Sequence, residues 1–252
     1  MRKLSLKTPA EIEIMKIGGA KLAWVRDQTI KQIKPGITGL AINSLATELI
    51  EEAGATPSFS KVKGYKFATC ININDGVVHS IPTSQKLKSG DVVSLDVGLC
   101  FNGFHTDTSI SIPVGKVSVG VTEFLNIGKL AVKKAIDQVK VGNRIWDLSN
   151  AMQTTVEKAG HGVVTALTGH GIGKYLHEEP AIPCFVAQKR EHTPKIVRGM
   201  VLAIEIMYAL KSGEVCYKNK DGWTIVTADG KIAGLFEQTV AVTDHGPLIL
   251  TQ

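Results

Sequence analysis

Two aspartates, Asp96 and Asp107, lie within a largely apolar stretch of the chain, residues 91–110. A carboxylate in apolar surroundings is costly to bury unless it is paired or bound to a cation. The stretch therefore has two interpretations. Either both acids are solvated on the open face of an exposed hairpin, or their carboxylates converge on one or two cations.

This stretch has the pattern of a β-hairpin, because Asn102-Gly103 separates two runs of alternating apolar residues. With these two residues at the turn, Gly98 faces Asp107, and each strand has one apolar and one polar face. Asp96 and Asp107 are then diagonal neighbours on the polar face, with carbons roughly 7–8 Å apart. Their carboxylates are close enough to share a cation site.

Two glutamates and one histidine extend this set. Glu205 and Glu237 each interrupt a strand-like apolar run, residues 201–207 and 235–242. One such glutamate could lie on an edge strand, but with the two aspartates they make four acids in apolar sequence. His170 lies in a glycine-rich segment, where the backbone can approach a ligand closely. A cation site that neutralises the four carboxylates is the economical explanation.

An oxygen-rich ligand set with one imidazole suits a Mn, Fe, Co or Zn ion. It does not match structural zinc sites, which are rich in thiolates. Two such ions, about 3.5–4 Å apart, can share carboxylates and a bridging water whose pKa is lowered toward neutrality. Histidines that bind no metal can stabilise an oxyanion or guide a leaving group. The chain also contains His79 and His177, although His79 taken alone could equally be an ordinary half-buried polar residue. The whole set indicates metal-assisted hydrolysis.

The elements that must position these residues begin with a pair of helices. Thr8-Pro9 and Glu11 form the pattern of an N-cap with a capping box, so a helix should begin there and end before Pro35. A second helix is expected over about Gly39–Ala53, and it should stop at Gly54, because glycine commonly follows the last residue of a helix.

The same pattern returns in the second half of the chain. Residues 33–54 align without gaps on residues 139–160, with five of 22 positions identical. We infer two related halves, about residues 10–115 and 120–245, each with two helices followed by strands. No linker rich in Pro, Gly or Ser separates them, so we expect residues 1–252 to form a single domain around a shared cleft.

The composition is that of a globular protein, with 252 residues, 44% of them hydrophobic, and a net charge of +6. The four cysteines are scattered, so we expect reduced thiols. No apolar run is long enough to cross a bilayer, and the charged start of the chain does not resemble a signal peptide. We therefore predict a cytoplasmic protein with no membrane contact. Spread-out lysines indicate an ordinary basic surface, with weak contact to RNA or the ribosome as the alternative.

The residues and segments that could form the site occur along the chain in the order His79, Asp96, Asp107, Gly-His-Gly-Ile-Gly at 169–173, His-Glu-Glu-Pro at 177–180, Glu205 and Glu237. In this order and spacing they resemble the bacterial-type, short-form methionine aminopeptidases of metallopeptidase family M24, over nearly the whole chain. The resemblance implies the α+β pita-bread fold, an antiparallel sheet with two helix pairs in pseudo-twofold halves, which agrees with the repeat.

The resemblance further implies a dinuclear centre with two divalent ions, which could be Co, Mn, Fe or Zn. Asp96 would chelate one ion, and His170 and Glu205 would bind the other. Asp107 and Glu237 would bridge both ions. Glu205 would also shuttle the proton of the bridging water.

By the same resemblance, His79 would contact the leaving amide side and His177 the scissile carbonyl. Tyr65, Cys70 and Trp223 match positions that shape the pocket for an N-terminal methionine. The partners implied are the N-termini of nascent polypeptides with a small second residue. We expect a monomer that binds no specific nucleic acid sequence, and a transient contact with the ribosome stays open.

Leu176 falls where the family more usually has a phenylalanine, and three positions next to the ligands depart from the family's pattern. Thr-Ile-Glu-Pro becomes Ala-Ile-Glu-Ile, with Ala203 and Ile206, and Glu-His-Thr becomes Glu-Gln-Thr, with Gln238. All five ligands are kept, so we keep the enzymatic assignment. Changes beside a ligand can shift metal affinity by about 10–100-fold, so the sequence leaves the affinity and the preferred metal open.

Two other functions fit part of the pattern. A proline-specific peptidase of the prolidase or aminopeptidase P type shares the fold, but usually carries an additional N-terminal domain, for which we see no room. A noncatalytic pita-bread protein that binds nucleic acid or ribosomes would suit the basic charge, but such a protein is expected to have lost metal ligands.

Overall fold

The computed structural model describes residues 4–218 and 220–252. Residues 1–3 lie outside the described residues. They belong to the start of the chain, whose sequence does not resemble a signal peptide. None of the helices in the described part is long and apolar enough to cross a membrane. The helices are α1 (Pro9–Lys31), α2 (Gly39–Glu52), η1 (Phe59–Lys61), α3 (Val119–Ile136), α4 (Ile145–Lys158) and η2 (Arg190–His192), where η denotes a short 3₁₀ helix.

The described strands form a ten-stranded antiparallel sheet and a separate three-stranded one. The main path of the large sheet runs through β1 (Thr56–Pro57), β4 (Val92–Phe101), β5 (Phe104–Pro113), β12 (Ala233–Thr243), β9 (Val201–Ala209), β7 (Thr168–Gly171) and β8 (Glu178–Pro183). Attached to β4, β9 and β12 are β2 (Thr69–Ile73), β6 (Gly162–Val163) and β13 (Gly246–Ile249). The small sheet has the order β10 (Val215–Tyr217), β11 (Ile225–Thr227) and β3 (Gly76–Val78).

The helices of the first half form where the sequence predicts them. Thr8 caps α1, and Glu11 completes the capping box. The Thr38 side chain accepts a hydrogen bond from the first turn of α2. This helix ends one residue earlier than predicted, because Ala53 is its C-cap and Gly54 takes a left-handed φ of +70°.

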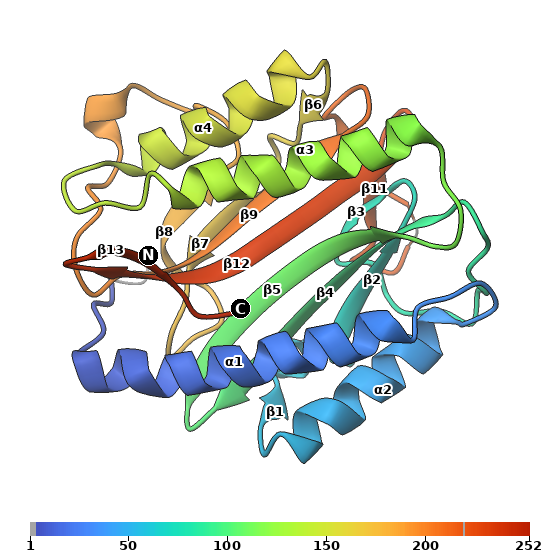
Figure 1. The fold of residues 1–252 in the computed structure, drawn as a ribbon, viewed down its shortest axis with the longest axis horizontal. Helices are drawn as coiled ribbons and strands as arrows, with labels where there is room; N and C mark the ends of the chain where they lie inside the picture. The colour runs from blue at the N-terminus through green and yellow to red at the C-terminus, as the bar shows by residue number, and fades with distance from the viewer. Residues whose placement is uncertain (1–3, 219) are drawn as a thin grey trace.

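The second half repeats the arrangement of the first. Gly36 and Gly142, which precede α2 and α4, have φ angles of +95° and +94°. Their N–H groups donate to the equivalent carbonyls of Leu87 and Ile196. Each helix pair is followed along the chain by a long antiparallel strand pair, β4–β5 or β9–β12, and Figure 1 shows the two pairs side by side between α1 and α3. The predicted antiparallel sheet with two helix pairs in pseudo-twofold halves is confirmed.

The β4–β5 hairpin has the predicted register. Its turn residues, Asn102 and Gly103, both have positive φ, and Gly98 lies opposite Asp107. The apolar face of the hairpin packs against α1 and α2, so its polar face points away from the helices. Asp96 is 9% exposed and Asp107 4%. These values exclude the alternative of two solvated acids on an open hairpin.

Candidate active site

Three acids lie in one row across four neighbouring strands of the large sheet. Asp96 on β4 lies opposite Ser109 on β5. Ser109 in turn lies opposite Glu237 on β12, and Glu237 lies opposite Glu205 on β9. Neighbouring strands are about 4.8 Å apart, so the row spans roughly 14 Å of backbone. The register of these four strands thus brings carboxylates from both halves of the chain to one face.

The remaining two predicted ligands lie beside this row. Asp107 is on β5 and His170 on β7. Ligand atoms of Asp107, His170 and Glu237 all lie within 4.8 Å of one another. Asp96 and Glu205 lie at the two ends of the row, outside this tight group. The centre of the cluster is therefore formed by one aspartate, one glutamate and one imidazole.

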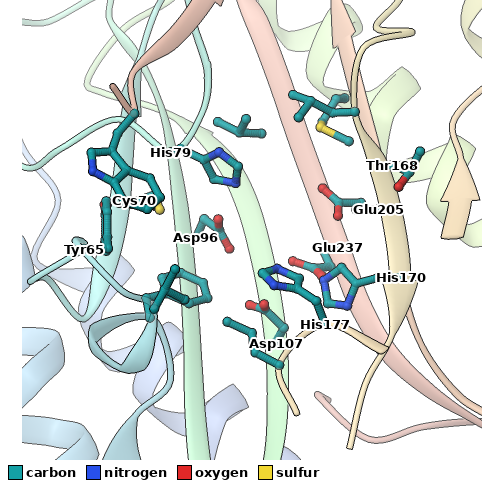
Figure 2. Close-up of a pocket in the computed structure, with 17 residues that line it drawn as sticks. Tyr65, Cys70, His79, Asp96, Asp107, Thr168, His170, His177, Glu205 and Glu237 are labelled. Atoms are coloured by element: carbon teal, nitrogen blue, oxygen red, sulfur yellow. Dashed lines mark hydrogen bonds between the residues drawn. The ribbon is translucent and has the colours of Figure 1, made fainter. Parts of the chain in front are cut away.

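All ten residues that the sequence predicts for the site line a single cavity of about 390 Å³ (Figure 2). The rings of His170 and His177 meet edge to face inside it, with centroids 4.5 Å apart. Much of the remaining wall is apolar. Beyond the predicted residues, the cavity is lined by Phe59, Val62, Val78, Leu167, Thr168, Leu176 and Met207.

Four carboxylates that are all ionised would be electrostatically unfavourable in this cavity. Burial raises the pKa of Asp96 to about 7, although a hydrogen bond with Cys70 acts in the other direction. Burial, together with the charges of neighbouring carboxylates, raises the pKa values of Asp107, Glu205 and Glu237 well above their usual range. Like charges so close in a region of low dielectric destabilise one another. A bound cation would reverse this balance.

The hydrogen-bonding of the acids fits divalent metal ions. Asp96 Oδ1, Asp107 Oδ1 and Glu237 Oε1 are buried and have no hydrogen-bond partner among the described residues. A buried oxygen of this kind is costly unless something binds it. Three carboxylate oxygens that line one cavity beside an imidazole are the donor set of a first-row divalent ion.

His170 presents the correct nitrogen for a metal. Its Nδ1 lies 2.8 Å from the carbonyl oxygen of Gly171, which can only accept a hydrogen bond. Nδ1 therefore carries the proton, and Nε2 keeps its lone pair for a ligand. Burial, reinforced by His177, lowers the pKa of His170 to about 3, so the imidazole is neutral at pH 7.

His79 occupies an unusual backbone conformation. Its φ is +57°, in the left-handed region that residues other than glycine rarely adopt. The next residue holds the turn, since the Ser80 N–H donates to Asn72 Oδ1 at 3.0 Å. Burial, reinforced by His177, lowers the pKa of His79 to about 4. A neutral imidazole is thus fixed in the cavity wall.

An aromatic wall lies across the cavity from the glutamates (Figure 2). The Tyr65 hydroxyl donates to the Thr69 carbonyl at 2.9 Å, and it lies 3.3 Å from Cys70 Sγ. The Trp223 ring packs edge-on against Tyr65, with centroids 5.0 Å apart. Burial raises the pKa values of Tyr65 and Cys70, so both groups stay uncharged. This wall suits an apolar side chain of a ligand.

The three departures from the family pattern lie around the ligand strands. Ala203 lies directly opposite His170. Ile206 is fully buried in the core of the second half, so it packs away from the cavity. Gln238 accepts a hydrogen bond from Thr251, and it lines a different cavity beside α1 and α3. Ile206 and Gln238 therefore point away from the cavity, on the far side of the predicted metal ligands.

The prediction from sequence omitted Thr168 and Met207, which also line the cavity. Thr168 lies two residues before His170 on β7, and Met207 lies two residues after Glu205 on β9. Alternate residues of a strand share a face. Strand alternation around each predicted ligand could therefore have identified both residues.

Comparisons with known proteins agree over the length of the chain. The model of metallopeptidase family M24 matches residues 13–244. A methionine aminopeptidase of Clostridium perfringens (strain 13 / Type A) is 42% identical over 246 residues, which are 98% of each chain. The crystal structure of a methionine aminopeptidase from Thermotoga maritima is similar with a TM-score of 0.95 and 37% identity, covering 99% of this chain and 100% of that one.

A more distant similarity concerns the fold alone. A prolidase from Pyrococcus furiosus has a TM-score of 0.80 and 23% identity. The match covers 98% of this chain but only 65% of the prolidase. The two proteins therefore share an architecture around which the longer chain adds further residues.

Proposed function

Because this chain belongs to metallopeptidase family M24, we propose that the acid-lined cavity is the active site that removes methionine from the N-termini of polypeptides. The enzyme is a hydrolase and a metal-dependent exopeptidase. The relatives favour this reaction over the proline-specific and noncatalytic alternatives. The proposal rests on one observation: carboxylate oxygens that have no hydrogen-bond partner in the described part of the chain line a single cavity with the neutral imidazoles of His79 and His170.

The ligand residues of the site would be the four acids and His170. We assign two divalent ions, Co, Mn, Fe or Zn, to this set, because four carboxylates exceed the charge that one ion neutralises. When bound, such ions polarise a carbonyl group and lower the pKa of a coordinated water toward neutrality. The residues assigned as ligands are Asp96, Asp107, His170, Glu205 and Glu237.

The chain's own groups have separate tasks in the reaction. Glu205, whose carboxyl faces the cavity at the end of the row, accepts a proton from the attacking water and passes it toward the leaving amine. His177 donates a hydrogen bond to the oxygen of the scissile carbonyl as negative charge develops there. His79, which is neutral at pH 7, contacts the leaving amide side.

The aromatic wall provides the specificity for methionine. Tyr65, Cys70 and Trp223 enclose an apolar region beside the acids. An unbranched thioether side chain fits such a region and makes favourable contacts between its sulfur and an aromatic ring. The free amino group of the same residue is attracted to the carboxylates, which explains why the enzyme acts on chain ends.

The location, the oligomeric state and the partners of the enzyme belong to the same proposal. The enzyme acts on the N-termini of nascent polypeptides, as a cytoplasmic monomer with at most a transient contact to the ribosome. The halves at about 10–115 and 120–245 act as one catalytic domain, since acids from both line the same cavity.

A peptide assay tests this function. Purified protein loaded with Mn, Fe or Co is given Met-Ala-Ser and, separately, a peptide of the X-Pro type. We expect release of methionine from Met-Ala-Ser, with a preference for a small second residue, and no cleavage of the X-Pro peptide. Cleavage of X-Pro alone would instead assign a proline-specific peptidase. Turnover of neither peptide with any of the three metals would contradict the proposal.

A further inference from the structure

An almost fully buried ion pair lies outside the cavity. Lys7 Nζ is 2.5 Å from Glu178 Oε2, and the two side chains are 3% and 2% exposed. Every other ion pair found among the described residues includes a side chain that is at least 47% exposed. A buried pair contributes less to stability than its distance suggests, because desolvation opposes the attraction. Such a pair calls for another explanation.

Glu178 holds the loop that carries His177. Its second oxygen, Oε1, accepts a hydrogen bond of 3.0 Å from the Tyr175 N–H. The Gly173 N–H donates to the Tyr175 carbonyl, also at 3.0 Å. The carboxylate thus closes a tight turn over residues 173–178, and His177 is the last residue of that turn before β8 begins.

Lys7 anchors the same turn to the rest of the molecule. It lies on the segment before α1, and its N–H donates to the Gly199 carbonyl at 2.7 Å. Gly173 leaves the space that the Lys7 side chain fills, since a Cβ there would collide with Lys7 Cε. On its other side the turn is held by β5, where the His105 N–H donates to the Gly173 carbonyl at 2.7 Å.

The turn over residues 173–178 places two of its side chains in the cavity wall. Leu176 and His177 both line the cavity wall, and the His177 ring lies against that of His170. We propose that Lys7 and Glu178 are positioning residues, which fix the His177 imidazole at the reacting carbonyl through the turn they clamp. The inference rests on the proposed function of His177. Neither Lys7 nor Glu178 lines the cavity, so they act through the turn.

A double-mutant cycle with His177 tests this assignment on the metal-loaded enzyme with Met-Ala-Ser. Lys7→Met should lower kcat by roughly 10–100-fold, because a displacement of a reacting group by about 1 Å can cost up to about 100-fold, with little change in KM. In the His177→Ala background, Lys7→Met should lower kcat no further. Lys7→Arg keeps the positive charge, so its kcat should lie between those of Lys7→Met and the wild type. Lys174→Met is the matched control, because it removes an exposed ion pair of the same turn.

Two results would overturn the assignment. One is a kcat for Lys7→Met within twofold of the wild type. The other is an equal fall in kcat with and without His177, because the ion pair would then act through overall structure. If Lys7→Met does not fold, the uncharged pair Lys7→Met/Glu178→Gln replaces it in the cycle, with the same expectations.

Amide hydrogen exchange separates a failure of this inference from a failure of the proposed function. In Lys7→Met, exchange at Gly173 and Tyr175 should be at least tenfold faster, while amides of β12 stay protected. Unchanged exchange at both amides would contradict the clamp, whatever the activity. A wild-type protein that releases no methionine would contradict the proposed function, and the exchange measurement would still decide the clamp.

Discussion

Glu205 and Glu237 lie directly opposite each other on β9 and β12, the two longest strands of the second half. Like charges at directly opposite positions of a sheet destabilise it. Both carboxyls also face the same cavity, where burial raises their pKa values well above the usual range. The fold therefore holds two acids where only a cation, or protons, can stabilise them.

This arrangement predicts that the metal-free protein loses stability as the pH rises from about 6.5 to 8. The folded state holds protons on carboxyls whose pKa is raised, Asp96 to about 7, whereas the unfolded chain has released them. His79, His105 and His170 have lowered pKa values and act with the opposite sign, but only below about pH 6.5. Thermal unfolding of chelator-treated protein measures the trend.

Added Mn or Co should abolish this loss, since an ion that binds only the folded state stabilises it by RT ln(1 + [L]/Kd). At about 100 times the Kd the gain is about 2.7 kcal/mol. A midpoint temperature that is independent of pH between 6.5 and 8 in metal-free protein would count against the raised pKa values. A midpoint unaffected by metal would count against the site.

Glu205→Gln is expected to lower kcat by about 10²–10⁴-fold, because glutamine keeps the shape of the side chain but cannot take up the proton that we propose Glu205 accepts from the attacking water. The fold should stay intact, and the metal-free variant should be at least as stable as the wild type, since one of two opposed acids is gone. Steady-state kinetics and thermal unfolding measure both effects. Glu214→Gln, at an exposed position, is the control. Turnover near the wild-type rate would remove Glu205 from proton transfer.

Gly98→Ala should weaken metal binding by about tenfold or more. A Cβ at this position would lie 2.9 Å from the Phe59 ring and 3.3 Å from Asp107 Oδ1, so both must move. Overpacking should also cost about 1–3 kcal/mol of stability. Calorimetric titration with Mn and denaturant unfolding measure the two effects. Gly120→Ala, where a Cβ meets nothing within 4 Å, is the matched control. Equal metal affinity in both variants would show that the close approach at Gly98 is unimportant.

Trp223→Ala should raise KM for Met-Ala peptides about tenfold and change kcat little. The ring packs against Tyr65, and under the proposed function it would contribute binding that substrate and transition state share. Tyr217→Ala, which removes an exposed aromatic side chain from the nearby β10, should leave KM unchanged. A fall in kcat at constant KM would instead place Trp223 in the chemical step.

Local patterns in the sequence predict much of this fold. Thr8 and Glu11 mark the start of α1, and Asn102-Gly103 fixes the register that puts Asp96 and Asp107 on one face. These signals act between residues close in the chain. The gapless alignment of residues 33–54 on residues 139–160 then predicted the two halves, and the comparisons confirmed the fold and the reaction class.

Local sequence patterns do not predict contacts between segments that are far apart in the chain. The row of acids depends on one pairing between the halves, Ser109 opposite Glu237, which no local pattern encodes. The Lys7–Glu178 pair joins residues 171 positions apart. Burial of a lysine beside a glutamate depends on the path of both backbones, so composition and periodicity give no sign of it.

Anomalous diffraction from crystals soaked with Mn or Co tests the central claim most directly. We predict two anomalous peaks in the cavity, within coordination distance of carboxylate oxygens from Asp96, Asp107, Glu205 and Glu237 and of His170 Nε2. A single peak would reduce the number of ions but keep the site. Fully occupied metal elsewhere in the molecule, with no peak among these five side chains, would contradict the account.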